Sequence, residues 1–147
     1  MENKLEVFTP NDRPNKEEKE KIVQFLFEQL QEYGDPIQDI EKAIGYAMKD
    51  YESFGGMILV SFIDDLISGV VVLNKTGMKD YIPENILVYI ATHKDMRGKG
   101  IGKFLMKKSI ELTDGNIALH VEPENPARFL YEKVGFTSKY IEMRHKK

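Results

Sequence analysis

A strand–turn–helix segment in the second half of the chain constrains the fold most. Ile86–Thr92 is a short run of apolar, β-branched and aromatic residues, which predicts a β-strand. A helical pattern follows, because Ile101 and Phe104 share one helical face. Between the predicted strand and the predicted helix lies Arg97-Gly-Lys-Gly-Ile-Gly102. Each glycine inside a helix costs about 1 kcal/mol relative to alanine, so a helix does not explain these glycines. Such glycines suit a backbone that a ligand approaches closely, and the unpaired N–H groups of a helix start suit a phosphate.

Three phosphate-binding motifs can be compared with this turn. The P-loop motif requires Ser or Thr after Gly-Lys, but Phe104 follows Gly102-Lys103. The dinucleotide fingerprint requires a third glycine where this chain has Lys103 or Leu105. What remains is Arg97-x-x-Gly100-x-Gly102, which resembles the signature of the GNAT superfamily, the acyl-coenzyme-A-dependent N-acetyltransferases.

A second stretch resembles the same superfamily. It reads Asn125-Pro-Ala-Arg-Phe-Leu-Tyr131-Glu-Lys-Val-Gly135-Phe136, with Asn before a helix, Tyr on it and Gly-Phe after it. Asn125 and Tyr131 are six residues apart, where many members have seven. The two signatures occur in the family's order, which is harder to obtain by chance than either alone.

Hydrophobic periodicity predicts an order of elements that matches the GNAT fold. The predicted strands are 4–9, 57–63, 67–73, 86–92, 116–121 and 137–143, and the predicted helices are 16–33, 37–48, 100–113 and 125–134. The resemblance implies an α/β protein with a mixed, mostly antiparallel sheet flanked by helices. It also implies that strands 86–92 and 116–121 run parallel and splay apart. We expect residues 1–147 to form a single domain.

Composition narrows the class of protein. The chain has 147 residues, of which 41% are hydrophobic and 31% charged, as in ordinary globular domains. Cysteine is absent, which excludes disulfides, Cys-based zinc sites and a cysteinyl acyl-enzyme. No apolar run approaches the roughly 18 residues of a membrane span, and the first residues lack a signal-peptide pattern. We therefore expect a cytoplasmic protein with no membrane partner.

Charge is distributed unevenly along the chain. From His93 onward there are 12 Lys and Arg and 7 Asp and Glu, a net charge of +5, whereas residues 1–92 carry a net charge of −8. This asymmetry favours a polyanionic cofactor and a cationic substrate. A nucleic-acid partner is not expected, because the whole chain is acidic and its basic residues form no stripe interleaved with aromatics.

The family resemblance implies where the cofactor, acetyl-CoA, would bind. The pantetheine arm would lie along Ile90-Ala91-Thr92, the pyrophosphate would face the N–H groups of residues 97–102, and lysines including Lys107 would meet the outer phosphates. The cofactor-binding residues implied in this way are Ile90, Ala91, Thr92, Arg97, Gly98, Lys99, Gly100, Ile101, Gly102, Lys103 and Asn125.

The resemblance also implies a general acid, because family members commonly use a tyrosine to protonate the departing thiolate. Tyr131 matches that position. A general base is also needed, since an amine of pKa about 10.4 arrives protonated. Many members carry a carboxylate on the strand that corresponds to 86–92, but this chain has none there. The candidates left open are Glu84, Tyr89, His120 and Glu122.

His120 and Glu122 are two residues apart and would share a face of one strand. The three histidines show no metal-ligand spacing, so we expect no metal.

The sequence thus predicts an N-acetyltransferase that transfers an acetyl group from acetyl-CoA directly to a primary amine. The amine acceptor, a small molecule or a peptide, is not defined by the sequence, and a homodimer is one option for the assembly. The alternative function is a non-catalytic GNAT-fold protein that binds acyl-CoA as a sensor or partner module.

Overall fold

The computed structural model of the protein describes residues 3–147, so Met1 and Glu2 of the expected single domain lie outside the described residues. The strands are β1 (Lys4–Phe8), β2 (Gly56–Ile63), β3 (Leu66–Lys75), β4 (Asn85–Thr92) and β5 (Ile117–Leu119). The α-helices are α1 (Lys16–Leu30), α2 (Ile37–Met48), α3 (Ile101–Leu112) and α4 (Ala127–Lys133). Two short 3₁₀ helices, η1 (Gln31–Tyr33) and η2 (Lys94–Met96), follow α1 and β4.

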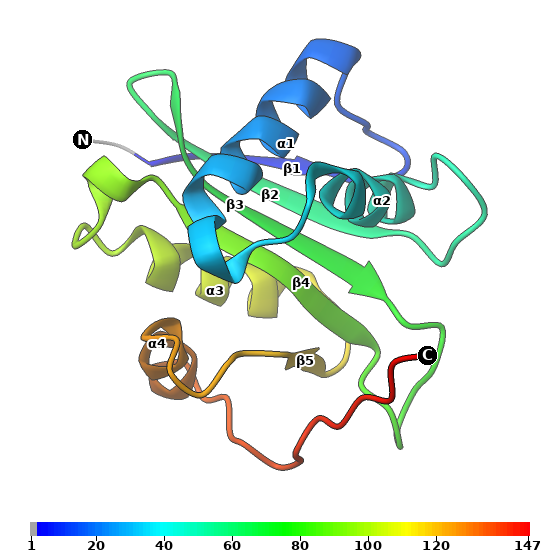
Figure 1. Ribbon diagram of the computed structural model, residues 1–147. Coiled ribbons are helices and arrows are strands. Elements are labelled where there is room, and N and C mark those ends of the chain that lie inside the picture. Colours follow the sequence, from blue (N-terminus) through cyan, green and yellow to red (C-terminus); the bar gives the residue numbers. More distant parts are fainter. Residues whose placement is uncertain (1–2) are drawn as a thin grey trace.

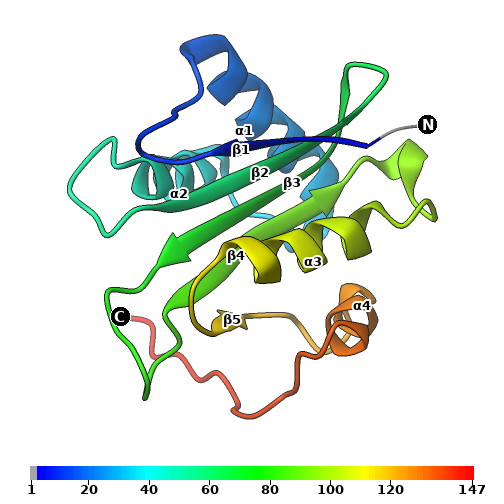
Figure 2. The same cartoon turned by 180° about the vertical axis from the view of Figure 1, so that it is seen from behind.

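These strands form one mixed sheet in the order β1-β2-β3-β4-β5. The pairs from β1 to β4 are antiparallel, whereas β4 and β5 are parallel. Helices α1 and α2 cover one face of the sheet, and α3 and α4 lie on the other (Figures 1 and 2). The predicted α/β fold with a mixed sheet and parallel fourth and fifth strands is confirmed.

Each face of the sheet has its own hydrophobic core. Ile40 and Ile44 of α2 pack with Leu26 of α1 over one face. Ile101 and Leu105 of α3 pack over the other. All five side chains are almost completely buried, and a fully buried aliphatic side chain contributes about 1.5–3 kcal/mol. The two cores hold β4 between the two pairs of helices.

Local signals fix the ends of the helices around the sheet. Asn15 caps α1, because its side chain accepts from the Glu18 N–H while the Glu18 carboxylate accepts from the Asn15 N–H. Pro36 is the N-cap residue of α2, and its carbonyl accepts hydrogen bonds from the N–H groups of Asp39 and Ile40 in the first turn. The short turn Gly34-Asp35-Pro36 therefore leads from η1 into α2 beside β4.

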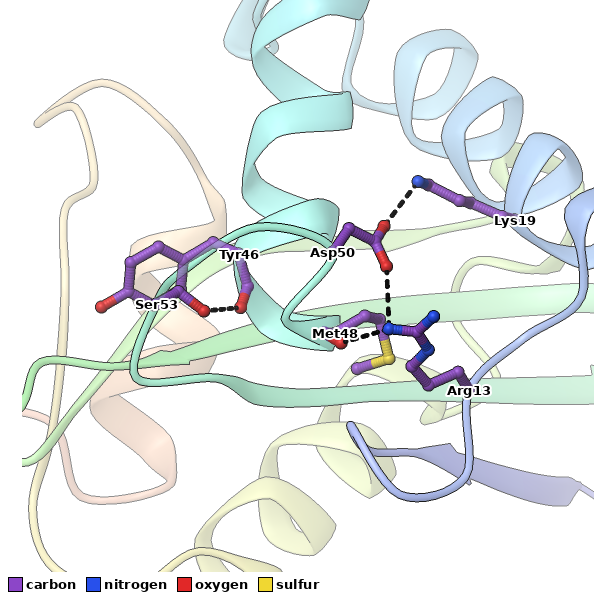
Figure 3. A network of polar contacts seen from close by, with 6 residues as sticks. All are labelled: Arg13, Lys19, Tyr46, Met48, Asp50 and Ser53. Carbon is purple, nitrogen blue, oxygen red and sulfur yellow. Dashed lines mark hydrogen bonds and ion pairs between the residues drawn. The ribbon is translucent and has the colours of Figure 1, made fainter.

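An ionic and hydrogen-bonded network ties the end of α2 to the N-terminal part of the chain (Figure 3). The Asp50 carboxylate lies 2.7 Å from the Lys19 ammonium and 3.4 Å from the Arg13 guanidinium. Arg13 also donates a hydrogen bond to the carbonyl oxygen of Met48, which lies at the end of α2. Because these groups are partly exposed, we assign the network a positional role more than a large energetic one.

The last predicted strand is wrong. Residues 137–143 form no strand, and Tyr140, Ile141 and Met143 are more than four-fifths exposed. A strand is stable only when its backbone groups pair with a neighbour, and β5, the edge strand of the sheet, pairs only with β4. The predicted strand 116–121 is also shorter, since it ends at Leu119.

Across residues 3–147, no helix has the length and apolar character needed to cross a membrane.

Candidate active site

Strand β4 changes its neighbours halfway along its length. It pairs with β5 only over Asn85–Leu87, and its register with β3 skips Val88. This β-bulge reverses the alternation of side chains, since Leu87 lies in the α3 core whereas Tyr89 lies in the α1–α2 core. The bulge therefore coincides with the point at which β4 and β5 separate.

The edge of β4 that β5 leaves unpaired borders a cavity of about 360 Å³. Ile90, Ala91 and Thr92 line one side of it, as the resemblance implied. Unpaired strand edges present N–H and C=O groups in a row, so an extended ligand can add to this edge as a strand would. The geometry suits a chain of amides.

The glycine turn closes one end of this cavity. Gly98 and Gly100 both have positive φ, of 84° and 77°, which glycine adopts without strain. A Cβ at either residue would meet no atom within 4 Å, so the space above this backbone is open. Gly102 differs, because a Cβ there would lie 2.9 Å from Cδ2 of Leu130. Gly102 thus allows α3 and α4 to pack closely.

Helix α3 begins at this turn without a side-chain cap. The first bond of the helix runs from the Phe104 N–H to the Gly100 carbonyl, which leaves the N–H groups of Ile101, Gly102 and Lys103 without a partner among residues 3–147. Three cations, Arg97, Lys103 and Lys133, line the cavity and no carboxylate does. Unpaired N–H groups at a helix start, together with cations, favour a phosphate group.

Tyr131 lies on the far side of the same cavity, on α4. It is 8% exposed, and its ring packs near Phe136 with 6.3 Å between ring centroids. Its hydroxyl makes no hydrogen bond within the described residues, yet it is not a buried unpaired atom, so it remains accessible. Burial raises the pKa of Tyr131 to about 12, which keeps the phenol protonated at neutral pH.

These residues fit an acyl-CoA. The open β4 edge can hold the pantetheine amides, and the open space above Gly98 and Gly100 admits a pyrophosphate at the start of α3. The described residues include no cluster of three or more His, Cys, Asp or Glu side chains arranged for a metal ion.

A second, larger cavity of about 720 Å³ adjoins the first. The two share Ile90–Thr92, Arg97, Ala127, Leu130 and Tyr131, and so form one continuous groove along β4. The second cavity extends under η1 to Glu32, Tyr33 and Asp35. Its far end is therefore built by the segment that joins α1 and α2.

Tyr89 and Asp35 meet in this second cavity. The Tyr89 hydroxyl donates a 2.6 Å hydrogen bond to Oδ2 of Asp35. Burial raises the pKa of Tyr89 first, and the hydrogen bond and charge of Asp35 raise it further. A phenol that donates to a carboxylate does not suit the role of general base, which was one option for Tyr89.

Glu84 lies at the opposite end of β4 and lines neither cavity. Its carboxylate accepts hydrogen bonds from the N–H groups of Asn116, at 2.6 Å, and Asp80, at 2.9 Å. These bonds hold the pKa of Glu84 below its ordinary value. The structure thus gives this base candidate a local role, joining the 76–84 loop to the start of β5.

His120 and Glu122 do not share a strand face, because β5 ends at Leu119 before either residue. His120 lines the second cavity, whereas Glu122 does not. Asn125 also lines that cavity, and its Oδ1 accepts from the Ala127 N–H at the start of α4. Lys99 is exposed and borders neither cavity.

A family model described as "Acetyltransferase (GNAT) domain" matches residues 41–138, two-thirds of the chain. This chain belongs to the GNAT acetyltransferase family. The resemblance drawn from the two sequence motifs is confirmed.

Solved structures share the GNAT fold over almost the whole chain. Similarity extends to a ribosomal-protein-alanine N-acetyltransferase from Brucella melitensis biovar Abortus 2308, with a TM-score of 0.65, 18% identity and 100% of both chains covered. It extends to the aminoglycoside N-acetyltransferase AAC(6')-Iy in complex with CoA, with a TM-score of 0.70, 14% identity and 99% and 95% coverage. A transcriptional regulator from Bacillus halodurans C-125 has a TM-score of 0.66, 20% identity and 98% and 100% coverage. No curated protein sequence matches this one.

Sequence reasoning missed several groove residues of this GNAT chain. Ala127, Leu130 and Lys133 follow a spacing of three on α4, so a helical projection from Tyr131 could have found them. No sequence pattern pointed to Asp35. Its hydrogen-bond partner Tyr89 is 54 residues away, and the turn Gly34-Asp35-Pro36 resembles an ordinary helix end.

Proposed function

We propose that this chain transfers an acetyl group from acetyl-CoA to a primary amine. The observation that carries the proposal is the unpaired edge of β4, which borders the same cavity as the accessible Tyr131 and the uncapped start of α3. One groove would thus provide a strand edge for the pantetheine arm, a proton donor for the thiolate and a site for the phosphates. Family membership supports acyl transfer, and the solved structure with CoA supports this cofactor.

The proposed reaction proceeds directly between the two substrates. Bound acetyl-CoA would supply an activated thioester. The acceptor ammonium loses one proton, its nitrogen forms the C–N bond, and the C–S bond breaks. Tyr131 protonates the leaving sulfur and regains a proton from the acylated nitrogen through water, so that one proton in total is released to solvent.

Backbone N–H groups of Ile90–Thr92 that face the groove would polarise the thioester carbonyl, because such donors stabilise charge that develops on an oxygen. Arg97, Lys103 and Lys133 would hold the phosphates. We place the protein in the cytoplasm, where acetyl-CoA is a common metabolite.

A second function, binding of acyl-CoA without turnover, is favoured by one observation. Strand β4 carries no carboxylate, so the base that many family members have on this strand is missing. Release of free thiol from acetyl-CoA, measured with a panel of amines, separates the two functions. Amine-dependent release at rates far above hydrolysis supports transfer, whereas tight acetyl-CoA binding without release supports the sensor.

A further inference from the structure

Asp35 offers the groove a carboxylate that β4 itself lacks. The turn Gly34-Asp35-Pro36 precedes α2, and a residue before proline is restricted to extended backbone. A Cβ on Gly34 would lie 2.8 Å from Cβ of Leu30, so this glycine lets the turn approach the end of α1. The turn thereby carries Asp35 over to Tyr89 on β4.

The hydrogen bond from Tyr89 holds only one oxygen of this carboxylate. Oδ2 accepts from the Tyr89 hydroxyl at 2.6 Å, a length typical of a bond to a charged acceptor. Oδ1 has no hydrogen-bond partner within the part of the chain that the structure describes, and Asp35 is exposed to the cavity it lines. A carboxylate accepts several hydrogen bonds, so Oδ1 is available to an ammonium group.

Charge differs between the two ends of the groove. The cavity at the glycine turn is lined by Arg97, Lys103 and Lys133, whereas the far end of the second cavity is lined by Glu32 and Asp35. Arg97 and Arg144 also border the second cavity, but they come from segments other than the α1–α2 connection.

Tyr33, which lines the far end, is influenced by the charges of nearby carboxylates. Its pKa is raised by partial burial and then by the charges of Glu32, Glu122 and Glu124. Glu122 and Glu124 line neither cavity, but they lie near enough for their negative charge to act on Tyr33, and this charge favours a cation at that end.

Tyr89 and Tyr131 approach the groove from opposite sides of the sheet. Tyr89 belongs to the core under α1 and α2, and Tyr131 belongs to the core under α3 and α4. A thioester on the β4 edge would thus have Asp35 on one side and the Tyr131 hydroxyl on the other. An amine held by Asp35 would reach the carbonyl from the face opposite the proton donor.

We propose that Asp35 is the acceptor-binding residue, that Tyr89 positions it, and that the acceptor is an amine that binds as a cation. This inference rests on the proposed transfer function and names the side chain that selects its substrate. Tyr89 acts through Asp35 and is a positioning residue.

The test uses the full chain with acetyl-CoA and three amines: spermidine, kanamycin and a peptide that begins with alanine. Variants Asp35→Asn and Tyr89→Phe are compared with Asp39→Asn, which removes a charge four residues away on α2 without touching either cavity. Thermal melts and calorimetric titration with acetyl-CoA check that each variant folds and binds the cofactor.

We expect Asp35→Asn to lower kcat/KM for the preferred amine at least about tenfold, mainly through KM, since hydrogen bonds to charged groups are the stronger ones. Tyr89→Phe should give a smaller loss in the same direction, and the double variant should lose no more than Asp35→Asn alone. Asp39→Asn should stay within about twofold of the wild type, with acetyl-CoA affinity unchanged throughout.

An Asp35→Asn variant that matches the wild type, or an Asp39→Asn variant that loses as much, would overturn the inference. If no amine supports turnover by the wild type, the proposed function fails instead. Titration of spermidine into the CoA-saturated protein then decides the inference: weaker binding by Asp35→Asn than by Asp39→Asn supports it, and equal or absent binding overturns it.

Discussion

The ring of Tyr131 is buried, whereas its hydroxyl is accessible from the groove. Tyr131→Phe keeps the ring that packs near Phe136 and removes only the proton donor. General acid catalysis contributes about 10²–10⁴-fold, so kcat should fall by that factor while acetyl-CoA affinity changes little. Steady-state thiol release and calorimetry measure the two quantities.

The matched control is Tyr46→Phe, which removes a hydroxyl that bonds the Lys75 carbonyl away from both cavities. Because the raised pKa of Tyr131 favours the protonated phenol, the wild-type enzyme should keep its proton donor through pH 10, and kcat should fall from loss of that proton only toward pH 12. Full activity of Tyr131→Phe would make this tyrosine a packing residue.

Gly100 tests the phosphate site. Its φ of 77° suits only glycine without strain, and a Cβ there would enter the open space above the turn. Gly100→Ala should weaken acetyl-CoA binding about tenfold, because close contact between the backbone and the pyrophosphate is lost. Gly135→Ala is the control, since Gly135 also has positive φ and open space but borders neither cavity.

In a calorimetric comparison, both alanine variants should lose similar stability, about 1 kcal/mol, but only Gly100→Ala should lose affinity. Equal affinities would remove the pyrophosphate from this turn. The structure favours Gly100 over Gly102 for the test, because substitution of Gly102 would also disturb Leu130 of α4.

At the scale of elements, the long periodic segments could be predicted from sequence. The faces of α1, α2 and α3 follow a helical repeat, and the glycine motif predicted the turn at which α3 begins. The last strand could not be predicted correctly, because residues 137–143 have strand-forming side chains but no neighbouring strand to pair with. Hydrophobic periodicity indicates which residues suit a strand, but it does not show whether a neighbouring strand is available to pair with it.

The bulge at Val88 was also beyond sequence reasoning. It places Tyr89 on the α1–α2 side of the sheet, where Asp35 reaches it. A shift of one residue in a strand moves a side chain to the other face, and no local pattern in Ile86–Thr92 signals this shift. The site therefore depends on a register that only the assembled sheet defines.

Glu84 links two loops and provides a test at this scale. Its pKa is lowered mainly by the Asn116 and Asp80 N–H groups, so its charged form stabilises the fold above the ordinary glutamate pKa of about 4.3. Glu84→Gln should lower Tm at pH 7, and the difference from wild type should shrink as pH falls below about 4. Thermal melts across pH measure this effect.

Activity adds a second readout for Glu84→Gln. Because Glu84 borders neither cavity, kcat should remain within about twofold of the wild type under conditions where both are folded. Glu41→Gln, on the exposed surface of α2, controls for the loss of a charge. A large loss of kcat in Glu84→Gln alone would return Glu84 to the role of general base.

At the scale of the molecule, the charge asymmetry of the sequence has a counterpart in the groove. Arg97, Lys103 and Lys133 line the end at the glycine turn, whereas Glu32 and Asp35 line the end built by η1 and the turn that follows it, in a cavity that Arg97 and Arg144 also border. Attraction between exposed charges weakens as the Debye length falls from about 10 Å at 0.1 M salt to about 3 Å at 1 M.

The KM for spermidine should therefore rise severalfold over that range of salt. The KM for benzylamine, which carries a single charge, should rise less over the same range of salt in steady-state assays at saturating acetyl-CoA. A salt-independent KM for spermidine, or a stronger salt effect on benzylamine, would argue against a cationic acceptor.

We propose that acetyl-CoA lies along the unpaired edge of β4 with its pyrophosphate at the start of α3. Amide NMR of the 147-residue chain during titration with CoA tests it directly. We expect the largest chemical-shift changes on residues 88–92 and 97–103, with little change in β1, β2 or α2. Changes centred on those other elements, or saturable binding that leaves residues 97–103 unshifted, would contradict it.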